Sequence, residues 1–354
     1  MVSGKLRITM KAAILKNVND LRIENLQMPK CGSDEILIEV KAAAICATDK
    51  KMILHGHKDL TFPRILGHEI AGIISKTGKN VKKLKIGNRV QISPGVVCGT
   101  CFYCREKHEN MCDNMKIIGF HINGGFSQYL HIPQKGIAAG VINSIPKNLT
   151  FEEACLAEPL ACCINALTLG NLSKGENIVI FGAGPIGCLL IQVSRLFGAE
   201  KIILVEPNKQ RLEFAKQFNA DYYIHDFNKN VFSTIKEKLK RTVNILISAC
   251  SHKKIPQWGI DILSKRGRIV FFSGIKQSYT NIPINYNLIH YKELSVIGAY
   301  GCTSKQNKTA LSLIHKKLIN VKSLITHYFC LDEIEKGLSF IKNKEGMKII
   351  INKF

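Results

Sequence analysis

The sequence lacks an uninterrupted apolar run of the kind that spans a membrane. Its longest uncharged stretch, Asn177–Ser194, has sufficient length, but it contains Gly182, Gly184, Pro185 and Gly187. Because such residues break a helix in its middle, we expect a strand, a tight turn and a helix here. The N-terminal segment MVSGKLRITMKAAIL also lacks the sustained apolar region of a secretory leader, so we expect a cytoplasmic protein with no membrane partner.

Low-complexity segments and internal repeats are absent as well. Apolar residues make up 46% and charged residues 22% of the chain, which excludes a disordered composition and is typical of soluble globular proteins. A chain of 354 residues exceeds the size at which one hydrophobic core stops growing. We therefore expect two globular domains.

Acidic residues are scarce, because 27 Asp and Glu stand against 50 Lys and Arg and leave a net charge of +23. Such a charge can attract the phosphates of nucleic acid. The lysines are scattered over nearly every segment, however, and the aromatic residues do not interleave with basic runs. This distribution argues against a specific nucleic-acid partner and leaves open an electrostatic attraction of an anionic substrate.

Two patterns of apolar residues divide the chain. Up to about residue 155, short β-rich runs such as Glu35–Val40 and Ala71–Ser75 alternate with turns rich in Gly, Pro and Lys. From Asn177 onward, apolar strands alternate with amphipathic helices at the spacing of βαβ units. The predicted strands are NIVIFG, KIILVEP, DYYIHD, VNILISAC and RIVFFSG, and the predicted helices are PIGCLLIQVSRLFGA, NKQRLEFAKQFNA, NVFSTIKEKLK and KIPQWGIDILSKRG. Continuous apolar strands covered by helices predict an α/β fold with a doubly wound parallel sheet.

The C-terminal tail carries a further alternation. A helix is predicted near Gln306–Leu318, a short strand around Thr326–Phe329, a helix from Asp332 and a final strand at MKIIINKF. The pattern alone leaves open whether this tail extends the parallel sheet or returns to the first domain.

Four of the thirteen cysteines lie close together, in the spacing Cys98-x-x-Cys101-x-x-Cys104-x7-Cys112. The total is odd and no secretory leader is recognisable in the sequence, so we expect metal binding in preference to disulfides. Four thiolates at this spacing can surround one tetrahedral zinc ion. Because no coordination position then stays open, we predict a structural zinc that stabilises a loop.

The segment FGAGPIG, residues 181–187, follows an apolar strand and opens an apolar helix, as the dinucleotide-binding fingerprint requires. Gly182 permits the tight turn, Gly184 lets the backbone approach a pyrophosphate, and Gly187 lets helix and strand pack closely. Pro185 and Ile186 complete the predicted cofactor-binding loop.

The residue that follows the next strand bears on the choice of cofactor. Glu206 lies 19 residues beyond Gly187, where a carboxylate can accept hydrogen bonds from ribose hydroxyls and repel a 2′-phosphate. We therefore predict NAD in preference to NADP. Arg211 is also placed among the cofactor-binding residues, and together with Lys209 it weakens that preference.

A second set of metal ligands is offered by Cys46, His68, Glu69 and Glu158. One thiolate, one imidazole and one carboxylate suit zinc, and three protein ligands leave a position for water or substrate. His68 and Glu69 are adjacent, so a regular strand would point them in opposite directions. Either the backbone is irregular there, or Glu69 and Glu158 alternate as the carboxylate ligand.

Together these motifs resemble a medium-chain zinc dehydrogenase, from the superfamily of alcohol, sorbitol and threonine dehydrogenases, over essentially the whole chain from Met10. The matching segments are Cys46-Ala47-Thr48-Asp49, Gly67-His68-Glu69, the four cysteines, Gly124-Gly125-Phe126, Glu158-Pro159-Leu160 and Gly182–Gly187. The resemblance implies a GroES-like, mostly β catalytic domain at residues 1–160 and 298–354, with a structural zinc lobe at 95–115. It further implies a Rossmann NAD-binding domain at 161–297 and assembly into a homodimer or homotetramer.

The details resemble one branch of this superfamily. Glu158-Pro159-Leu160 is similar to sorbitol and threonine dehydrogenases, whereas alcohol dehydrogenases typically carry a cysteine as the third ligand, and His55-Gly56 is similar to sorbitol dehydrogenase. Lys51 stands where relatives often carry a histidine that relays protons. Gly301-Cys302 replaces an Arg-Tyr pair that sorbitol dehydrogenase places near its substrate, which argues against sorbitol itself as the substrate.

The resemblance also assigns chemical roles. Zinc would act as a Lewis acid on the alcohol, and hydride would pass to the nicotinamide. Thr48 would be the first proton acceptor, and Asp49 would orient His68. We therefore predict an oxidoreductase with two zinc ions per chain that transfers a hydride to NAD from a secondary hydroxyl of a polyol, cyclitol or sugar alcohol.

Three alternatives remain open. The substrate can be phosphorylated, because Lys50, Lys51 and Lys58 follow Cys46 and a lysine can meet a phosphate as a point charge, although these lysines are equally explained as solvated surface residues. The enzyme can be similar to an L-threonine 3-dehydrogenase. A non-catalytic zinc protein that binds nucleic acid or a protein partner is the third alternative, and the retained set of catalytic-metal ligands argues against it.

Overall fold

The computed structural model describes residues 9–225, 230–239, 243–275 and 281–354. The chain forms two compact units, the first comprising Met1–Ala161 and Cys302–Phe354 and the second comprising Cys162–Gly301. The sequence analysis placed these boundaries at 160/161 and 297/298. Three segments named in the sequence analysis extend into residues outside these ranges. The N-terminal segment MVSGKLRITMKAAIL begins in residues 1–8, the predicted strand DYYIHD ends on Asp226, and the predicted helix NVFSTIKEKLK ends on Lys240. Within those ranges, every helix is too short or too polar to cross a bilayer.

The first unit is built on a sheet with the strand order β10-β6-β5-β3-β18-β17, to which β9 adds by pairing with β3. These strands are β3 (Ile36–Ile45), β5 (Glu69–Thr77), β6 (Arg89–Ile92), β9 (Tyr129–Ile132), β10 (Ile142–Ser144), β17 (Ile325–Cys330) and β18 (Lys348–Lys353). Ala42 and Ala44 of β3 are fully buried, and their small side chains leave room for helix α4 (Phe151–Cys155), which packs against β3 and β5.

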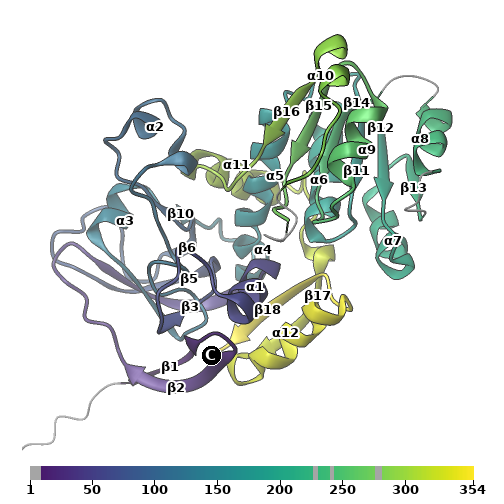
Figure 1. Ribbon diagram of the computed structural model, residues 1–354. Coiled ribbons are helices and arrows are strands. Elements are labelled where there is room, and N and C mark those ends of the chain that lie inside the picture. The colour runs from purple at the N-terminus through teal and green to yellow at the C-terminus, as the bar shows by residue number, and fades with distance from the viewer. Residues whose placement is uncertain (1–8, 226–229, 240–242, 276–280) are drawn as a thin grey trace, which may run out of the picture. The chain divides into compact units, whose positions relative to one another are not determined.

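The C-terminal tail returns to the first unit. Strand β18 pairs antiparallel with the end of β3, with Ile350 opposite Ala44, so the two chain ends share one sheet (Figure 1). Ile349 and Ile351 of β18 belong to the same hydrophobic core as Ile38 of β3 and Ile70 of β5. This pairing answers the question that the sequence left open about the tail.

The remaining elements of the first unit are short. Two smaller sheets have the orders β2-β1-β4 and β7-β8, from β1 (Thr9–Asn17), β2 (Asp20–Gln27), β4 (Arg64–Ile65), β7 (Gly95–Val96) and β8 (Lys116–Ile117). The helices are α1 (Ala47–His55), α2 (Phe102–Arg105), α3 (Gln134–Ala138), α11 (Ser304–His315) and α12 (Ile334–Asn343), with 3-10 turns η1 (Glu109–Met111), η4 (Lys322–Leu324) and η5 (Leu331–Glu333). Helix α5 (Ala157–Leu169) begins in this unit and continues into the second.

The second unit is a parallel sheet with the order β13-β12-β11-β14-β15-β16. Its strands are β11 (Asn177–Phe181), β12 (Lys201–Val205), β13 (Tyr222–Ile224), β14 (Val243–Ser248), β15 (Leu263–Phe271) and β16 (Ser295–Gly298). Its helices are α6 (Pro185–Leu196), α7 (Lys209–Ala215), α8 (Val231–Leu239), α9 (Ile255–Ile262) and α10 (Tyr286–Lys292), with the 3-10 turn η2 (Lys216–Phe218). Strand β11 is buried along its whole length, which explains its unbroken apolar sequence. The predicted α/β class with a parallel sheet is confirmed.

Some predicted boundaries were wrong. The helix predicted over residues 254–267 ends at Ile262, because Leu263 already pairs with Val243 of β14 and starts β15. Strand β16 was missed; its residues are largely exposed, so they lack the continuous apolar pattern of the inner strands. Helix α11 ends at His315 and not near Leu318, since Lys317 adopts a positive φ of 57° that ends a right-handed helix.

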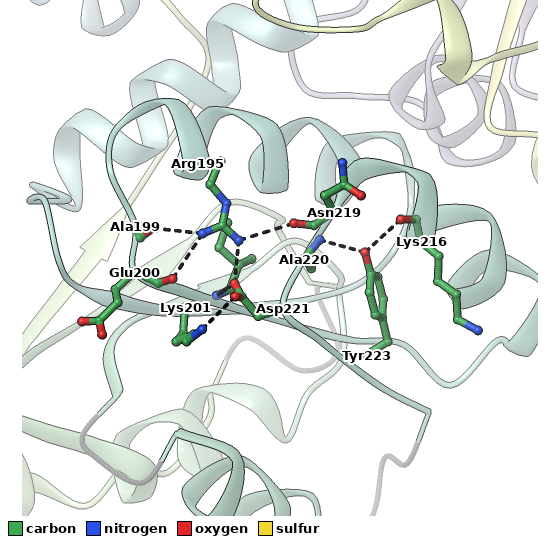
Figure 2. Close-up of polar contacts among 10 residues, drawn as sticks. Arg195, Ala199, Glu200, Lys201, Lys216, Asn219, Ala220, Asp221 and Tyr223 are labelled. Atoms are coloured by element: carbon green, nitrogen blue, oxygen red, sulfur yellow. Dashed lines mark hydrogen bonds and ion pairs between the residues drawn. The ribbon is translucent and has the colours of Figure 1, made fainter.

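A polar network ties α6 to the starts of β12 and β13 (Figure 2). The Arg195 guanidinium lies 2.5 Å from the Asp221 carboxylate and donates to the carbonyl oxygens of Ala199, Glu200 and Asn219. Asp221 also accepts from the Ile202 amide at 2.9 Å and pairs with Lys201 at 3.2 Å. Burial opposes ionisation of Asp221, but these donors outweigh it and lower the pKa of Asp221 from its usual 3.8.

We expect Asp221→Asn to lower the free energy of unfolding by about 1–2 kcal/mol at pH 7, because it removes the charged acceptor, while solvent at the part-exposed Arg195 screens part of the effect. A carboxyl whose pKa is lowered by folding stabilises the folded state above its unfolded pKa, and this stabilisation is lost as the pH falls through the folded-state pKa. The difference between the two proteins should therefore shrink below about pH 4. Urea unfolding over a pH series measures it.

The matched control is Asp261→Asn, an exposed carboxyl of α9 in the same unit, which should change stability little. Unfolding midpoints that are equal for Asp221→Asn and the unmodified protein at pH 7 would show that the network is not stabilising.

Candidate functional site

Cys46 is placed by the junction between β3 and α1. It is the residue that caps the amino end of α1, and its sulfur accepts from the Thr48 amide at 3.5 Å. The Asp49 carboxylate accepts from the Cys46 amide at 2.8 Å and completes the reciprocal cap. The Cys46-Ala47-Thr48-Asp49 motif is therefore a helix start that also fixes the cysteine side chain.

His68 and Glu69 lie where β5 begins. Gly67 has a positive φ of 93°, a conformation that favours glycine, and Glu69 then enters the sheet opposite Ala44 of β3. The backbone is thus irregular just before the strand, which was one of the two alternatives for this adjacent pair. As a result, the ligand atoms of Cys46, His68 and Glu69 lie within 4.8 Å of one another.

A buried carboxylate, that of Asp49, lies next to the ring of His68. Nδ1 of His68 lies 3.2 Å from an oxygen of Asp49, whose side chain is fully buried. Burial alone would lower the pKa of His68, but Asp49 and then Cys46 raise it well above its usual value. Asp49 therefore orients the ring through Nδ1 and leaves Nε2 for another partner.

The Glu69 carboxylate is held by a lysine from the other end of the chain. Both of its oxygens lie 2.5 Å from the ammonium of Lys348, the first residue of β18, and both side chains are buried. Burial would lower the pKa of Lys348, but Glu69, Cys46 and Glu158 raise it. Lys348 was missed by the sequence analysis; the one signal for it was a charge at the head of the apolar run MKIIIN.

Glu158 occupies the first turn of α5, with an exposed fraction of 9%. It is near enough to Lys348 to influence the pKa of that lysine. Among the described residues, however, it is not within 4.8 Å of all three ligand atoms of Cys46, His68 and Glu69. Of the two alternative carboxylate ligands, Glu69 is the one that the fold brings to the cysteine and histidine.

The donor set and the charge balance both fit a divalent cation. Three carboxylates, from Asp49, Glu69 and Glu158, are buried in this region, and Lys348 is the only lysine among the buried side chains that the structure describes. Burying carboxylates without compensating charge is costly. A divalent cation held by a thiolate, an imidazole and a carboxylate supplies that charge, and this set of donors suits zinc.

The lysines that follow Cys46 lie elsewhere. Lys51 and Lys58 are exposed. Lys50 lines a pocket of about 230 Å³ together with Leu338 and Lys342 of α12. Thr48, the predicted proton acceptor, is half-buried in the first turn of α1, two residues from Cys46.

The four clustered cysteines form a separate group. Cys98, Cys101, Cys104 and Cys112 bring their sulfurs within 4.8 Å of one another. The sulfur of Cys98 lies 3.5 Å from that of Cys112 and 4.0 Å from that of Cys104. Sulfurs on a tetrahedral zinc with bonds of about 2.3 Å are about 3.8 Å apart, so the spacing fits this metal.

The backbone amides of this loop favour negative charge on the sulfurs of Cys98 and Cys101. The amides of residues 100 and 101 donate to Cys98 and lower its pKa to about 5. Burial raises the pKa of Cys104 to about 12, where fewer amides offset it. The thiols of this group therefore differ in pKa. A cation bound between them would allow all four to be ionised at the same time.

The glycine-rich loop connects β11 to α6 in the second unit. Gly182 has a φ of 107°, and a side chain on Gly187 would lie 1.8 Å from the carbonyl oxygen of Gly182. This close approach explains why the position holds glycine. Helix α6 begins at Pro185 after Gly184, with no side-chain cap among the described contacts, so its first amides can bind a phosphate.

Glu206 follows β12 and lies beside this loop. Its carboxylate accepts from the Ala183 amide at 2.7 Å and from the Asn208 amide at 2.9 Å. Each oxygen keeps a second lone pair for a further donor. Burial lowers the pKa of Arg211, and its guanidinium lies 3.7 Å from where a side chain on Gly184 would begin. The fold therefore brings an acidic and a basic side chain to the same loop.

Comparison with known proteins agrees with this picture. The family model of the alcohol dehydrogenase GroES-like domain matches residues 32–143, and that of the zinc-binding dehydrogenase matches residues 185–316. Sorbitol dehydrogenase of Bacillus subtilis (strain 168) is 30% identical over 351 residues, which cover 97% of each chain.

Solved structures match over the whole chain as well. A zinc-binding dehydrogenase from Sinorhizobium meliloti 1021, bound to NADP, has a TM-score of 0.90 and 28% identity, covering 98% of this chain and 99% of the other. The alcohol dehydrogenase RspB from E. coli CFT073, complexed with NADH, has a TM-score of 0.89 and 26% identity, covering 97% and 99%. The predicted resemblance is confirmed, and this chain belongs to the zinc-dependent medium-chain family of alcohol and polyol dehydrogenases.

Proposed function

We propose that this enzyme oxidises a secondary hydroxyl of a polyol, cyclitol or sugar alcohol with NAD, using a zinc ion bound by Cys46, His68 and Glu69. The observation that carries the proposal is the meeting of these three donor types in a region where buried carboxylates outnumber lysines. Glu158 is kept as an exchangeable carboxylate, since it is buried near the same lysine.

Each residue of the site has a separate task in this proposal. When bound, zinc supplies Lewis acidity toward the hydroxyl oxygen and the nicotinamide supplies the hydride acceptor. The Thr48 hydroxyl, beside Cys46, accepts the hydroxyl proton and passes it toward solvent. Asp49 fixes the ring of His68, and Lys348 fixes the carboxylate of Glu69.

Several observations favour a neutral polyol as the substrate. The B. subtilis relative acts on a polyol, as its name states. Lys51 and Lys58 are exposed, so neither is buried with the proposed ligands. A separate observation supports the cytoplasm as the compartment, because none of the thirteen cysteines forms a disulfide.

We expect the purified protein to contain two zinc ions per chain and to form NADH from at least one polyol in a panel of sugar alcohols, cyclitols, polyol phosphates and L-threonine. Cys46→Ala should remove one zinc and lower kcat/KM by at least about 1000-fold, because one of three protein ligands is lost. Elemental analysis and NADH absorbance measure the two effects.

Cys101→Ser is the matched control, since it removes a sulfur from the four-cysteine centre. It should lower zinc content and thermal stability together, because a closed metal site contributes to folding. Zinc content that Cys46→Ala leaves unchanged, or NADH formed only from L-threonine, would contradict the proposal.

We further propose that NAD is preferred to NADP. Glu206 lies beside the loop with lone pairs available for ribose hydroxyls, and a 2′-phosphate there would meet its negative charge. Arg211 lies against Gly184 and limits this preference. The two similar structures bind NADP and NADH, respectively, so the family fold accepts either.

Glu206→Ala should reduce the ratio of kcat/KM for NAD over that for NADP by about 10- to 100-fold, the scale of one charge-assisted hydrogen bond. Initial rates with both cofactors at a saturating polyol concentration measure the ratio. Glu213→Ala, an exposed acidic residue on α7, serves as the control. A higher kcat/KM for NADP in the unmodified enzyme would refute the preference.

We propose that the chain forms a homodimer or homotetramer through strand β16. This strand pairs with β15 on one side, and its other side has no strand partner in the described residues. Val296 on β16 and the neighbouring Tyr300 are 43% and 54% exposed, and Tyr291 is 77% exposed. An exposed edge with apolar side chains is a surface on which the same strand of a second copy can pair around a two-fold axis.

Val296→Lys should shift the species measured by light scattering toward the monomer, because two like charges would meet at such an edge. Ile86→Lys changes an exposed aliphatic residue in the first unit and should leave the mass unchanged. A monomeric unmodified protein, or an unaltered mass for Val296→Lys, would contradict this interface.

A further inference from the structure

Three polar side chains gather near His68 in the first unit and have no part in the mechanism above. His57 and Asp59 follow α1, and His121 follows β8. Nδ1 of His57 lies 3.6 Å from one oxygen of Asp59, and Nε2 of His121 lies 3.9 Å from the other. The side chains are 34%, 29% and 20% exposed, so a ligand can reach them.

One aromatic ring joins this group to the proposed metal ligand. The ring of Phe120 contacts that of His57 edge-on at 5.5 Å and that of His68 at 5.6 Å between centroids. The His57 ring therefore lies no more than about 11 Å from the His68 ring. Phe120 is 7% exposed and fills the space between them.

Backbone contacts determine which nitrogen of each imidazole faces outward. Nδ1 of His57 accepts from the Asp59 amide at 3.2 Å, and Nδ1 of His121 accepts from the Ile117 amide at 3.1 Å. In the neutral ring the proton is then on Nε2, which becomes a donor. Burial lowers the pKa of His121, with Lys116 and Arg64 adding to the effect and Asp59 opposing it.

The group thus offers two N–H donors around one carboxylate acceptor. Nearby, the Arg64 guanidinium donates to Asn123 at 3.2 Å and to Thr61 at 3.0 Å. Each sugar-alcohol hydroxyl is both a donor and an acceptor, so neighbouring hydroxyls can bridge an imidazole N–H and a carboxylate.

We infer that His57, Asp59 and His121 form a subsite that binds the hydroxyl groups of the polyol distant from the one that is oxidised. This inference rests on the proposed polyol oxidation. Phe120 is the apolar surface between the reacting carbon and this subsite.

The length of the substrate distinguishes binding of the distant hydroxyl groups from a general effect on the active site. A six-carbon polyol, with C–C bonds of about 1.5 Å, has the length to place a hydroxyl at His68 and another beyond Phe120. A four-carbon diol such as 2,3-butanediol reaches the metal ligands but carries no distant hydroxyl. It is therefore a substrate that the subsite should not affect.

His57→Phe and Asp59→Asn should each raise KM for the best six-carbon polyol about ten-fold, the scale of one lost hydrogen bond to a charged group, with kcat nearly unchanged. KM for 2,3-butanediol should change less than about two-fold. The rise in melting temperature that the polyol produces in the zinc-loaded protein should be lost in both variants, which gives a readout independent of turnover. Asp59→Asn preserves side-chain shape, so it tests the subsite if His57→Phe folds poorly.

His131→Phe is the matched control. His131 forms another histidine–carboxylate pair in the same unit, 2.9 Å from Glu35, with an exposed fraction of 30%. Its substitution should leave both substrates unaffected. If the variants weaken both substrates equally, or neither, the inference is wrong. If no alcohol is oxidised but the polyol still stabilises the protein in a His57-dependent way, the proposed function fails and the subsite stands.

Discussion

The pair between Glu69 and Lys348 is the interaction on which the rest of the first unit depends. Both side chains are buried, and removing either partner of such a pair costs about 3–5 kcal/mol because the other charge is left uncompensated. Lys348 opens β18, and β18 aligns beside β3 only because the chain returns to this unit after the parallel sheet. The charge balance of the candidate metal site is therefore a constraint on the path of the whole chain.

The same constraint explains why the site is assembled from separate segments. Cys46 directly follows β3, His68 follows the turn at Gly67, and Glu69 is the first residue of β5, where it pairs with Ala44 of β3. No single short segment of the chain could by itself balance the charge of three carboxylates and a thiolate. The sheet joins them because β5 and β18 run antiparallel to β3 and begin beside the residues at which β3 ends.

Much of this arrangement could be predicted from local patterns. The four-cysteine spacing, the glycine-rich loop and the apolar strands after Asn177 depend on near neighbours in the chain, so the sequence carries their signals directly. The local pattern could not predict the return of β18, because an apolar strand fits either sheet equally well until its partner is known. Only the family resemblance implied that residues 298–354 belong to the catalytic domain. The choice between Glu69 and Glu158, and the ion pair of Lys348, depend on long-range pairing for the same reason.

The predicted bounds were wrong for two strands of the parallel sheet, because their sequences lack the continuous apolar run of an inner strand. Strand β16 pairs with β15 but exposes most of its side chains, so its sequence does not show the continuous apolar run of an inner strand. The start of β15 was hidden by amphipathic spacing that continues from α9 into Leu263. In both cases the pairing partner, and not the residue itself, decides the secondary structure.

Local charge, and not the net charge of +23, bears on the choice of substrate. The lysines are spread over the chain, whereas Asp49, Glu69 and Glu158 are buried together with one lysine. With a divalent cation and a thiolate at Cys46, the four negative groups outnumber the three positive charges of the cation and Lys348. An anionic group near the reacting carbon would therefore be repelled, while a hydroxyl would not be. A strongly basic protein can thus present a site that is suited to neutral, hydroxyl-rich molecules.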